Sequence, residues 1–410
     1  MCVRLIVVAF CVVAWCQAHG QCVCSGSVTG LRGKILPAAH VALMTPDRTS
    51  VVQIVQASPE GKYCLTVPRP GFWALRFTGV GYADESIALY APGSAPVTLN
   101  VALGGYHYIP GEPPLTVGGD FNLWSIATAV PLTRGSDGTF SADVPVVGDS
   151  VTFRIRGYRD GDGVEGIAGA TYVLNSKGGY DARVKATGGT ARVTVDPSQL
   201  DRSGTRVQVE FGGPEQSRRI VDAVREWWEG DEAYTAEQLV AAMGRPHFDT
   251  TVTDWNAFTQ RVLHRADAEK DPLVRSVCAL AYVSVGLKSR HRDVAALTRC
   301  MGRLFATSPV WVLNPIAISS AVRGTSWSAP QREKYIQAAV GRNPYPSVRV
   351  AVICTEFTSA LNADQNRKAA RYYDLLMDRY GDTPAAKELR KSYPRPEVPA
   401  DTARAASRQH

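Results

Sequence analysis

The feature that most constrains this chain is a change of hydrophobic periodicity between Phe211 and Glu215. Before it, apolar and polar residues alternate in short runs separated by glycine and proline, which is the pattern of half-buried β-strands. After it, apolar residues recur every three or four positions, as at Ile220, Val221 and Val224, which is typical of amphipathic helices. The 410 residues are therefore predicted to form a multidomain protein, all-β and then all-α.

The N-terminus has the composition of an export signal. Arg4 precedes an apolar run over residues 5–15, and the small residues Ala18 and Gly20 follow it. This pattern predicts a signal peptide over residues 1–20, a mature chain that begins at Gln21, and a periplasmic or extracellular location. No later apolar run reaches about 18 residues, so no transmembrane segment is expected in the mature chain.

A lipoprotein is the alternative interpretation of this N-terminus. Lipidation requires a small residue before the modified cysteine, whereas Trp15 precedes Cys16 and Gln21 precedes Cys22. The sequence therefore favours cleavage without lipidation.

Residues 21–103 are predicted to form a first antiparallel β-sandwich, because short β-branched runs alternate with glycine and proline turns. The order and spacing of several motifs resemble the carboxypeptidase regulatory-like (transthyretin-like) domain. The resemblance implies a seven-stranded sandwich without catalytic residues. The motifs are Ser27–Gly30, Pro37–Val41, Pro59–Tyr63, Pro70–Trp73 and Val80–Tyr82.

Residues 104–114 are rich in glycine and proline and are predicted to be a linker to a second β-sandwich over residues 115–213. The segments 118–125, 137–144 and 151–155 resemble the glycogen-binding type of early-set sandwich. In this resemblance Phe121 and Trp124 mainly pack the sandwich. Trp124 is also the candidate glycan-binding residue, since aromatic faces stack on sugars.

Residues 214–391 are predicted to form an irregular α-helical array. Pro272–Cys278 resembles Pro346–Val352, which indicates a repeat of 74 residues, and residues 371–384 resemble a tetratricopeptide-type helix with its exit turn. The resemblance is to HEAT or tetratricopeptide arrays, whose stacked helices present extended binding surfaces. The tail over residues 392–410 is expected to be disordered.

The order of the three modules resembles the front part of bacterial exported proteins that end in a thioredoxin-like (redoxin) domain. This chain has no Cys-x-x-Cys motif, so the redox activity of those proteins is not implied for it. The module order leaves one hypothesis, that the protein is an accessory of a periplasmic thiol-redox system.

No catalytic motif is present in the sequence, and neither a catalytic residue nor a cofactor is predicted. The seven histidines are scattered, and the motifs of zinc proteases, serine hydrolases and phosphate-binding loops are absent. Asp160, Asp162 and Glu165 could ligate calcium, but their spacing misses the helical-loop consensus. A solvated hairpin turn is the favoured interpretation, so no metal site is predicted.

Six cysteines follow the predicted signal peptide, and two disulfides are candidates. Cys278 and Cys300 lie at similar heights on consecutive predicted helices, residues 273–287 and 293–305, so they are candidates for a bridge. Two buried thiols are the alternative. Cys64 is expected to pair with Cys24 or Cys22 if it pairs at all.

The formal net charge of +7 lies in the helical part, where residues 217–410 hold 28 Lys/Arg against 21 Asp/Glu. Such a surplus is usually a solvated surface, and export argues against nucleic acid as a partner. The sequence therefore favours a non-catalytic scaffold or interaction protein that binds an unknown protein partner through its helical module. A carbohydrate-binding protein that acts on surface glycans and the redox accessory are the alternatives.

Overall fold

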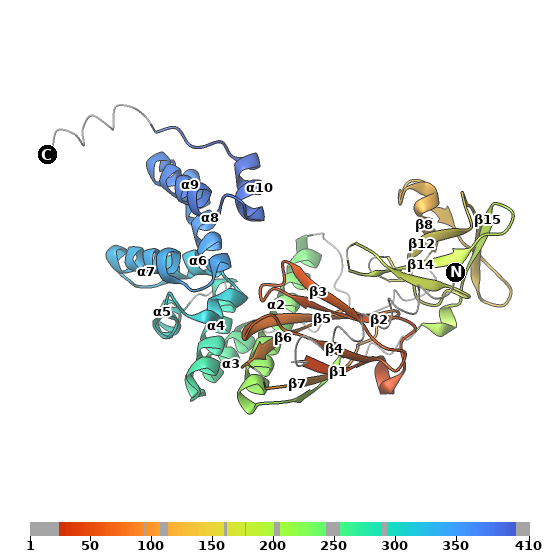
Figure 1. The fold of residues 1–410 in the computed structure, drawn as a ribbon, viewed down its shortest axis with the longest axis horizontal. Coiled ribbons are helices and arrows are strands. Elements are labelled where there is room, and N and C mark those ends of the chain that lie inside the picture. The colour runs from red at the N-terminus through yellow and green to blue at the C-terminus, as the bar shows by residue number, and fades with distance from the viewer. Residues whose placement is uncertain are drawn as a thin grey trace, which may run out of the picture. The chain divides into compact units, whose positions relative to one another are not determined.

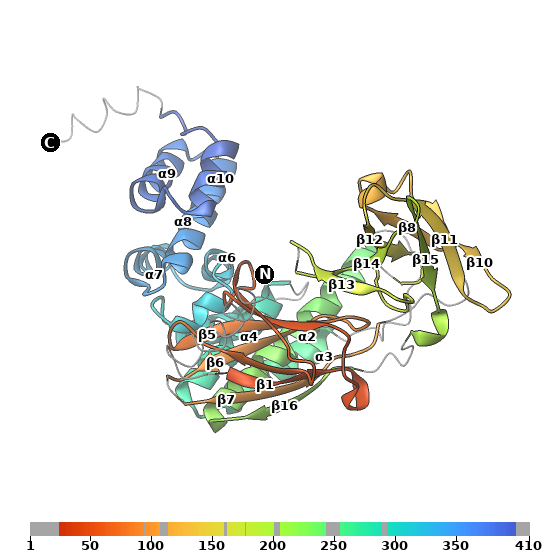
Figure 2. The ribbon, with the colours of Figure 1, turned by 45° about the vertical axis from the view of Figure 1, so that its right-hand side comes forward.

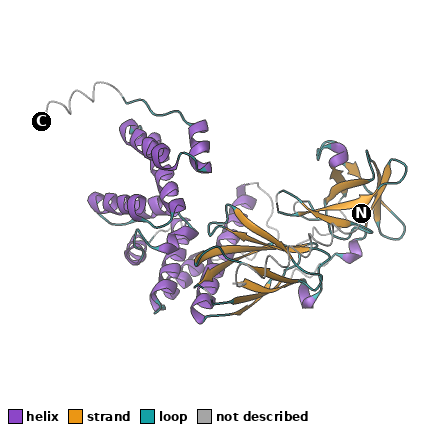
Figure 3. Cartoon of the chain, in the orientation of Figure 1, coloured by secondary structure: helices purple, strands orange, loops and turns teal. Residues whose placement is uncertain are grey.

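The computed structural model describes residues 24–93, 95–106, 114–159, 162–176, 178–200, 206–242, 255–288 and 293–398. Strands occupy the first part of the chain and helices the second, as Figures 1 and 3 show. The chain divides into two compact units at Pro214 and Glu215, although Ala88–Tyr90 group with the second unit. The predicted fold class is confirmed: β-sandwiches are followed by an irregular helical array. The predicted signal peptide lies outside the described residues.

The first β-module consists of two four-stranded sheets, with strand orders β16–β7–β1–β4 and β3–β2–β5–β6. The pairs β1–β4, β2–β3 and β2–β5 are antiparallel, but β1 and β7 run parallel. The sequence predicted an antiparallel sandwich, but the parallel pair β1–β7 is an exception. Its elements are β1 (Cys24–Thr29), η1 (Leu31–Gly33), β2 (Ala39–Met44), β3 (Val51–Gln56), β4 (Lys62–Leu65), β5 (Gly71–Gly79), β6 (Glu85–Ala91) and β7 (Val97–Ala102).

Strand β16 (Gln208–Gly212) is the eighth strand of the first module. It pairs antiparallel with β7, and Gln208 lies opposite Ala102 and Gly212 opposite Thr98; Figure 2 shows the two strands side by side. The prediction that the second sandwich extends to residue 213 is therefore wrong at its last strand. The sequence of β16 alternates like that of any other strand, so it does not reveal which strand β16 pairs with. That partner lies more than 100 residues away in the chain.

The second β-module lies between β7 and β16 and has two sheets, with strand orders β13–β14–β12–β8–β9 and β10–β11–β15. Buried Val151, Phe153 and Ile155 alternate along one strand, as expected when one face of a sheet is covered. The elements are β8 (Thr116–Gly119), η2 (Asp120–Asn122), β9 (Val130–Pro131), β10 (Thr133–Arg134), β11 (Phe140–Pro145), β12 (Ser150–Arg156), β13 (Thr171–Leu174), β14 (Tyr180–Lys185), β15 (Thr190–Val195) and η3 (Pro197–Gln199).

The hydrophobic core of the second module includes a residue of the first. Val80, in the turn after β5, belongs to the same buried cluster as Phe153 and Val193, and Ala38 packs against that cluster. The turn between β5 and β6 therefore joins the two β-modules.

The described part of the second unit contains nine α-helices and one 3₁₀ helix, none long and apolar enough to cross a membrane. Side chains cap the starts of two of these helices: Asp271 accepts hydrogen bonds from the amides of Leu273 and Val274, and Ser328 caps α7. The elements are α2 (Glu215–Ala242), α3 (Trp255–Ala268), α4 (Pro272–Lys288), α5 (Val294–Arg303), η4 (Pro309–Leu313), α6 (Ala317–Gly324), α7 (Ala329–Arg342), α8 (Pro346–Asn362), α9 (Asn366–Tyr380) and α10 (Pro384–Ser392).

The predicted 74-residue repeat corresponds to repeated helices. Helices α3 and α7 have 14 residues each and begin at residues 255 and 329. Helices α4 and α8 have 17 residues each and begin at the repeated prolines, Pro272 and Pro346. Because both pairs of helices are offset by the same 74 residues, the array contains two equivalent helical units rather than a chance match of seven residues.

The start of the predicted disordered tail is ordered. Arg395 forms a bidentate ion pair with Asp374 of α9, with both N–O distances 2.7 Å. The rings of Tyr393 and Phe357 also meet edge to face. Disorder from residue 392 onward is therefore wrong for these positions, and residues 399–410 lie outside the described residues.

The bridge predicted between Cys278 and Cys300 is not formed, because both are free, buried thiols. Similar height on neighbouring helices is not enough for a disulfide, since the two sulfurs must also face each other. Cys278 instead contacts Arg265 of α3. Burial raises the pKa of the Cys278 thiol to about 11 and that of Cys300 to about 12. The alternative interpretation, two buried thiols, is therefore the correct one.

Cys64 is disulfide-bonded, whereas Cys24, at the buried start of β1, is a thiol whose pKa burial raises to about 12. A pair between Cys24 and Cys64 is therefore excluded. Cys22, the other partner that the sequence offered, lies outside the described residues.

We expect peptide mapping to separate these cysteines. In the native protein at neutral pH, iodoacetamide should not modify Cys278 or Cys300, because their thiols are buried and protonated. In denaturant without reductant both should be modified completely, whereas Cys64 should be recovered linked to Cys22. Modification of Cys278 or Cys300 only after reduction would contradict this assignment.

Candidate functional site

The loop that follows β8 is held by two polar side chains. Asn122 Oδ1 accepts a hydrogen bond from the amide of Gly119, and its Nδ2 donates to the carbonyls of Ser125 and Thr128, all at 2.9–3.0 Å. Asp120 Oδ2 accepts from the amide of Thr152 on β12 at 3.0 Å. These bonds tie both ends of the loop to the second β-module, so the loop has a defined shape.

The residues between these anchors form an apolar tip, which we call the 123–126 loop. Leu123 is 89% exposed, Trp124 36% and Ile126 78%. Leu123 and Trp124 have φ angles of 53° and 61°, a left-handed conformation that non-glycine residues rarely adopt. A loop that combines backbone strain with exposed apolar side chains is a candidate binding element.

Trp124 does not pack the sandwich, contrary to the prediction. Phe121 is half-buried and packs against the core of the second module, whereas Trp124 does not belong to that core. The two left-handed residues turn the chain outward, so Trp124 reaches the surface. There the guanidinium of Arg154 lies 5.6 Å from its ring centroid, and Arg156 Nη2 donates to its carbonyl at 3.4 Å. The candidate glycan-binding residue is thus at the surface beside a cation.

The turn after β12 is not the solvated hairpin that the sequence predicts. Glu165 is only 5% exposed and accepts from Arg159 Nε at 2.8 Å and from the amide of Val164 at 2.8 Å. The guanidinium of Arg159 lies 3.8 Å from the ring centroid of Tyr106, in the segment after β7. Arg159 and Glu165 therefore pack beside the segment that follows β7, and Glu165 does not face solvent.

The calcium alternative gains no support from this turn. Asp162 binds Arg156 Nε at 2.8 Å, and Glu165 is held by Arg159. Asp160 lies outside the described residues. Over the described ranges, no group of three or more histidine, cysteine, aspartate or glutamate residues is arranged to hold a metal ion.

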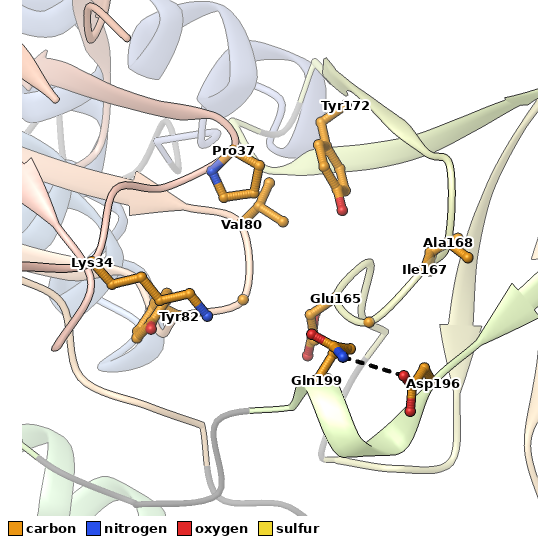
Figure 4. A pocket seen from close by; sticks show the side chains of 12 residues that line it. Lys34, Pro37, Val80, Tyr82, Glu165, Ile167, Ala168, Tyr172, Asp196 and Gln199 are labelled. Carbon is orange, nitrogen blue, oxygen red and sulfur yellow. Dashed lines mark hydrogen bonds between the residues drawn. The ribbon is translucent and has the colours of Figure 1, made fainter. Parts of the chain in front are cut away.

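Two neighbouring cavities flank Glu165, and Val80, Gly81 and Glu165 line both. The first has a volume of about 430 Å³, and Figure 4 shows Lys34 and Pro37 of the first module on one side and Tyr172 and Gln199 of the second on the other.

The second cavity, which we call the junction pocket, has a volume of about 410 Å³. Its side chains come from β5, from the linker and from β12–β14. They are Arg76, Thr78, Val80, Asp84, Tyr106, Arg154, Arg159, Asp162, Val164, Glu165, Asn175 and Tyr180, with Gly79, Gly81, Gly163 and Gly179. Sequence analysis missed this pocket because its lining comes from segments about 100 residues apart. The only local signal was the density of charges in residues 158–166.

The helical module has a buried carboxylate and a surface cavity. Glu356 of α8 binds Arg323 of α6 at 3.0 Å and Lys368 of α9 at 3.4 Å. A cavity of about 500 Å³ lies beside Asn314 and Ile316. Ile316 is exposed, so this part of the helical surface offers an apolar contact beside basic groups.

Comparisons of the chain with protein-family models, with characterised proteins and with solved structures gave no match. The candidate sites therefore rest on the geometry described above.

The exposure of Trp124 predicts a small stability effect. Trp124→Ala should lower the free energy of unfolding by about 1 kcal/mol or less, as for surface positions. The matched core substitution Phe153→Ala, at a completely buried aromatic residue of β12, should cost about 3–5 kcal/mol. Urea denaturation of the full chain measures both values. If both substitutions lowered the free energy of unfolding equally, Trp124 would have to be a core residue.

Proposed function

We propose that this protein is an exported, non-catalytic interaction protein that binds a protein partner through the 123–126 loop. The observation that carries the proposal is the exposure of Leu123, Trp124 and Ile126 on a loop whose shape is fixed by Asn122 and Asp120. Water solvates three neighbouring apolar side chains poorly, so a partner that covers them gains the free energy of their burial.

The composition of the loop favours a protein over a glycan. Aliphatic side chains such as Leu123 and Ile126 fill apolar pockets on proteins, whereas sugars are bound by aromatic faces together with hydrogen-bonding groups. Tryptophan and arginine dominate the binding energy of protein interfaces, and Trp124 lies beside Arg154.

Carbohydrate binding is the second candidate function. It is favoured by one specific observation, that the indole of Trp124 is exposed beside a guanidinium rather than buried. A sugar could stack on the open part of the ring while Arg154 donates to its hydroxyls. If the ligand is a sugar, the side chains of Leu123 and Ile126 would contribute little to the binding energy.

The helical module supports the same general function. Its two equivalent 74-residue units form an array of the kind that presents extended binding surfaces, and it carries the excess of positive charge. We propose it as the second surface for a protein partner. The redox alternative gains nothing from Cys278 and Cys300, because burial raises the pKa of both thiols and keeps them protonated at neutral pH.

Capture experiments with the full-length protein distinguish the two candidates. Immobilised protein carrying Leu123→Ser, Trp124→Ala or Ile126→Ser is compared with the parent for proteins retained from the native envelope fraction and for retention on polysaccharide gels. For a protein partner, each substitution should reduce retention by about tenfold, because each removes part of one apolar contact. For a glycan, only Trp124→Ala should matter, and only on the gels.

Val147→Ser is the matched control, because Val147 is a fully exposed apolar residue of the same module outside the loop. It should leave every measurement unchanged. Undiminished capture of proteins by all three loop variants would exclude the loop and leave the helical module as the binding surface.

A further inference from the structure

The junction pocket is dense in charged groups but carries no net charge. Arg76, Arg154 and Arg159 line it together with Asp84, Asp162 and Glu165. Each of these arginines has a carboxylate partner: Asp84 for Arg76, Asp181 for Arg154 and Glu165 for Arg159. An anionic or cationic ligand would have to compete with these ion pairs, so the pocket is unsuited to a charged ligand.

The ion pairs do not use all the hydrogen-bonding atoms of these arginines and carboxylates. Arg76 binds a single oxygen of Asp84, Oδ2, through both Nε and Nη2, and Oδ1 has no hydrogen-bond partner among the described residues. Arg154 binds Asp181 through Nε alone. The wall of the pocket therefore offers both donors and acceptors that a neutral polar ligand can use while the ion pairs stay intact.

One buried side chain of the pocket wall has an unmet polar atom. Thr78 lines the pocket and is 4% exposed, and its hydroxyl has no hydrogen-bond partner in the described part of the chain. His40 lies opposite Thr78 in the pairing of β2 with β5 and is 1% exposed. Its Nδ1 is 3.1 Å from the hydroxyl of Tyr180, which also lines the pocket, and its imidazole also has a backbone hydrogen bond with Gly178.

Buried polar atoms in folded proteins nearly always have a partner, which is protein, water or ligand. The hydroxyl of Thr78 is at the wall of the pocket, so a molecule bound there could satisfy it. The aromatic lining adds the hydroxyls of Tyr106 and Tyr180, which are protonated at neutral pH, as tyrosine ordinarily is, and burial raises the pKa of both to about 12.

We propose that the junction pocket binds one ring of a neutral polyhydroxylated ligand, that is, a sugar. Each hydroxyl of such a ligand both donates and accepts, which matches the mixed set formed by Thr78, Asp84 and Arg154. The volume of about 410 Å³ lies in the ordinary range for small-molecule pockets, about 300–1,000 Å³. None of the exposed residues of the 123–126 loop lines the pocket, although Arg154 both lines the pocket and contacts the ring of Trp124.

Thermal-shift and calorimetric titrations of the full-length protein test this proposal. The probes are glucose, galactose, mannose and N-acetylglucosamine at millimolar concentration, with inorganic phosphate and free arginine as charged comparators. At least one sugar should raise the melting temperature in a saturable way, and the comparators should not. Retention on starch, cellulose and chitin distinguishes a polysaccharide end from a free sugar as the source of the ring.

Two substitutions assign the binding to the pocket. Thr78→Val removes the unpartnered hydroxyl and keeps the side-chain shape, so folding should be preserved while the affinity falls by about tenfold, the loss of one hydrogen bond. Asp84→Asn keeps the shape but alters the acceptor and should also weaken binding. Thr98→Val, at an exposed threonine of β7, is the matched control and should bind as the parent does.

Sugar binding that is lost in Trp124→Ala but keeps the parent affinity in Thr78→Val would place the sugar at the 123–126 loop instead. The proposal is overturned if no sugar in the panel binds, if phosphate binds as well as any sugar, or if Thr78→Val retains the parent affinity.

Discussion

The pairing of β16 with β7 is the constraint on which the β-unit depends. The five residues of β16 lie opposite Thr98–Ala102 of β7, the strand from which the chain leaves the first module. The chain therefore leaves the first sheet and returns to it at neighbouring positions, and the second β-module is an insertion between them. Both ends of the inserted module are held by one sheet, and Val80 anchors the first module to its core. Two covalent connections and the apolar contacts of Val80 and Ala38 thus restrict where the second module can lie.

This restriction explains why a polar pocket persists at the junction. Strand β5 contributes Arg76 and Thr78, whereas β12 and the turn after it contribute Arg154 and Arg159. Charged groups that lose solvent need partners, and each of these arginines has a carboxylate. Some polar atoms, among them the buried hydroxyl of Thr78, have no hydrogen-bond partner in the described part of the chain. In our account these atoms, rather than the ion pairs, define what the pocket binds.

The sequence predicted those features that depend on local patterns. The fold class followed from the change of periodicity near Phe211, and the 74-residue repeat followed from two prolines that begin equal helices, α4 and α8. The caps at Asp271 and Ser328 are equally local, because each side chain binds amides within the next three residues. In each case the residues that determine the structure are neighbours in the chain.

The features that the sequence did not predict depend on distant residues or on backbone conformation. The partner of β16 lies more than 100 residues away, and Glu165 is buried by contacts with Arg159 and Tyr106 that no spacing rule reveals. Trp124 was expected in the core because its motif resembles one that packs, but two left-handed residues direct it outward. The cysteines on α4 and α5 have matching heights, yet height does not determine where the sulfur points.

Hydrogen exchange of the full chain, followed by mass spectrometry in two destabilised variants, tests the insertion most directly. Phe153→Ala weakens the core of the second module, and Leu99→Ala weakens β7 in the first, since both side chains are completely buried. If the second module is an insertion, peptides of β12 and β14 lose protection in Phe153→Ala while residues 208–212 keep theirs. In Leu99→Ala, residues 208–212 should lose protection together with β7. Loss of protection in residues 208–212 together with β12 in Phe153→Ala would contradict the account, because β16 would then belong to the second module.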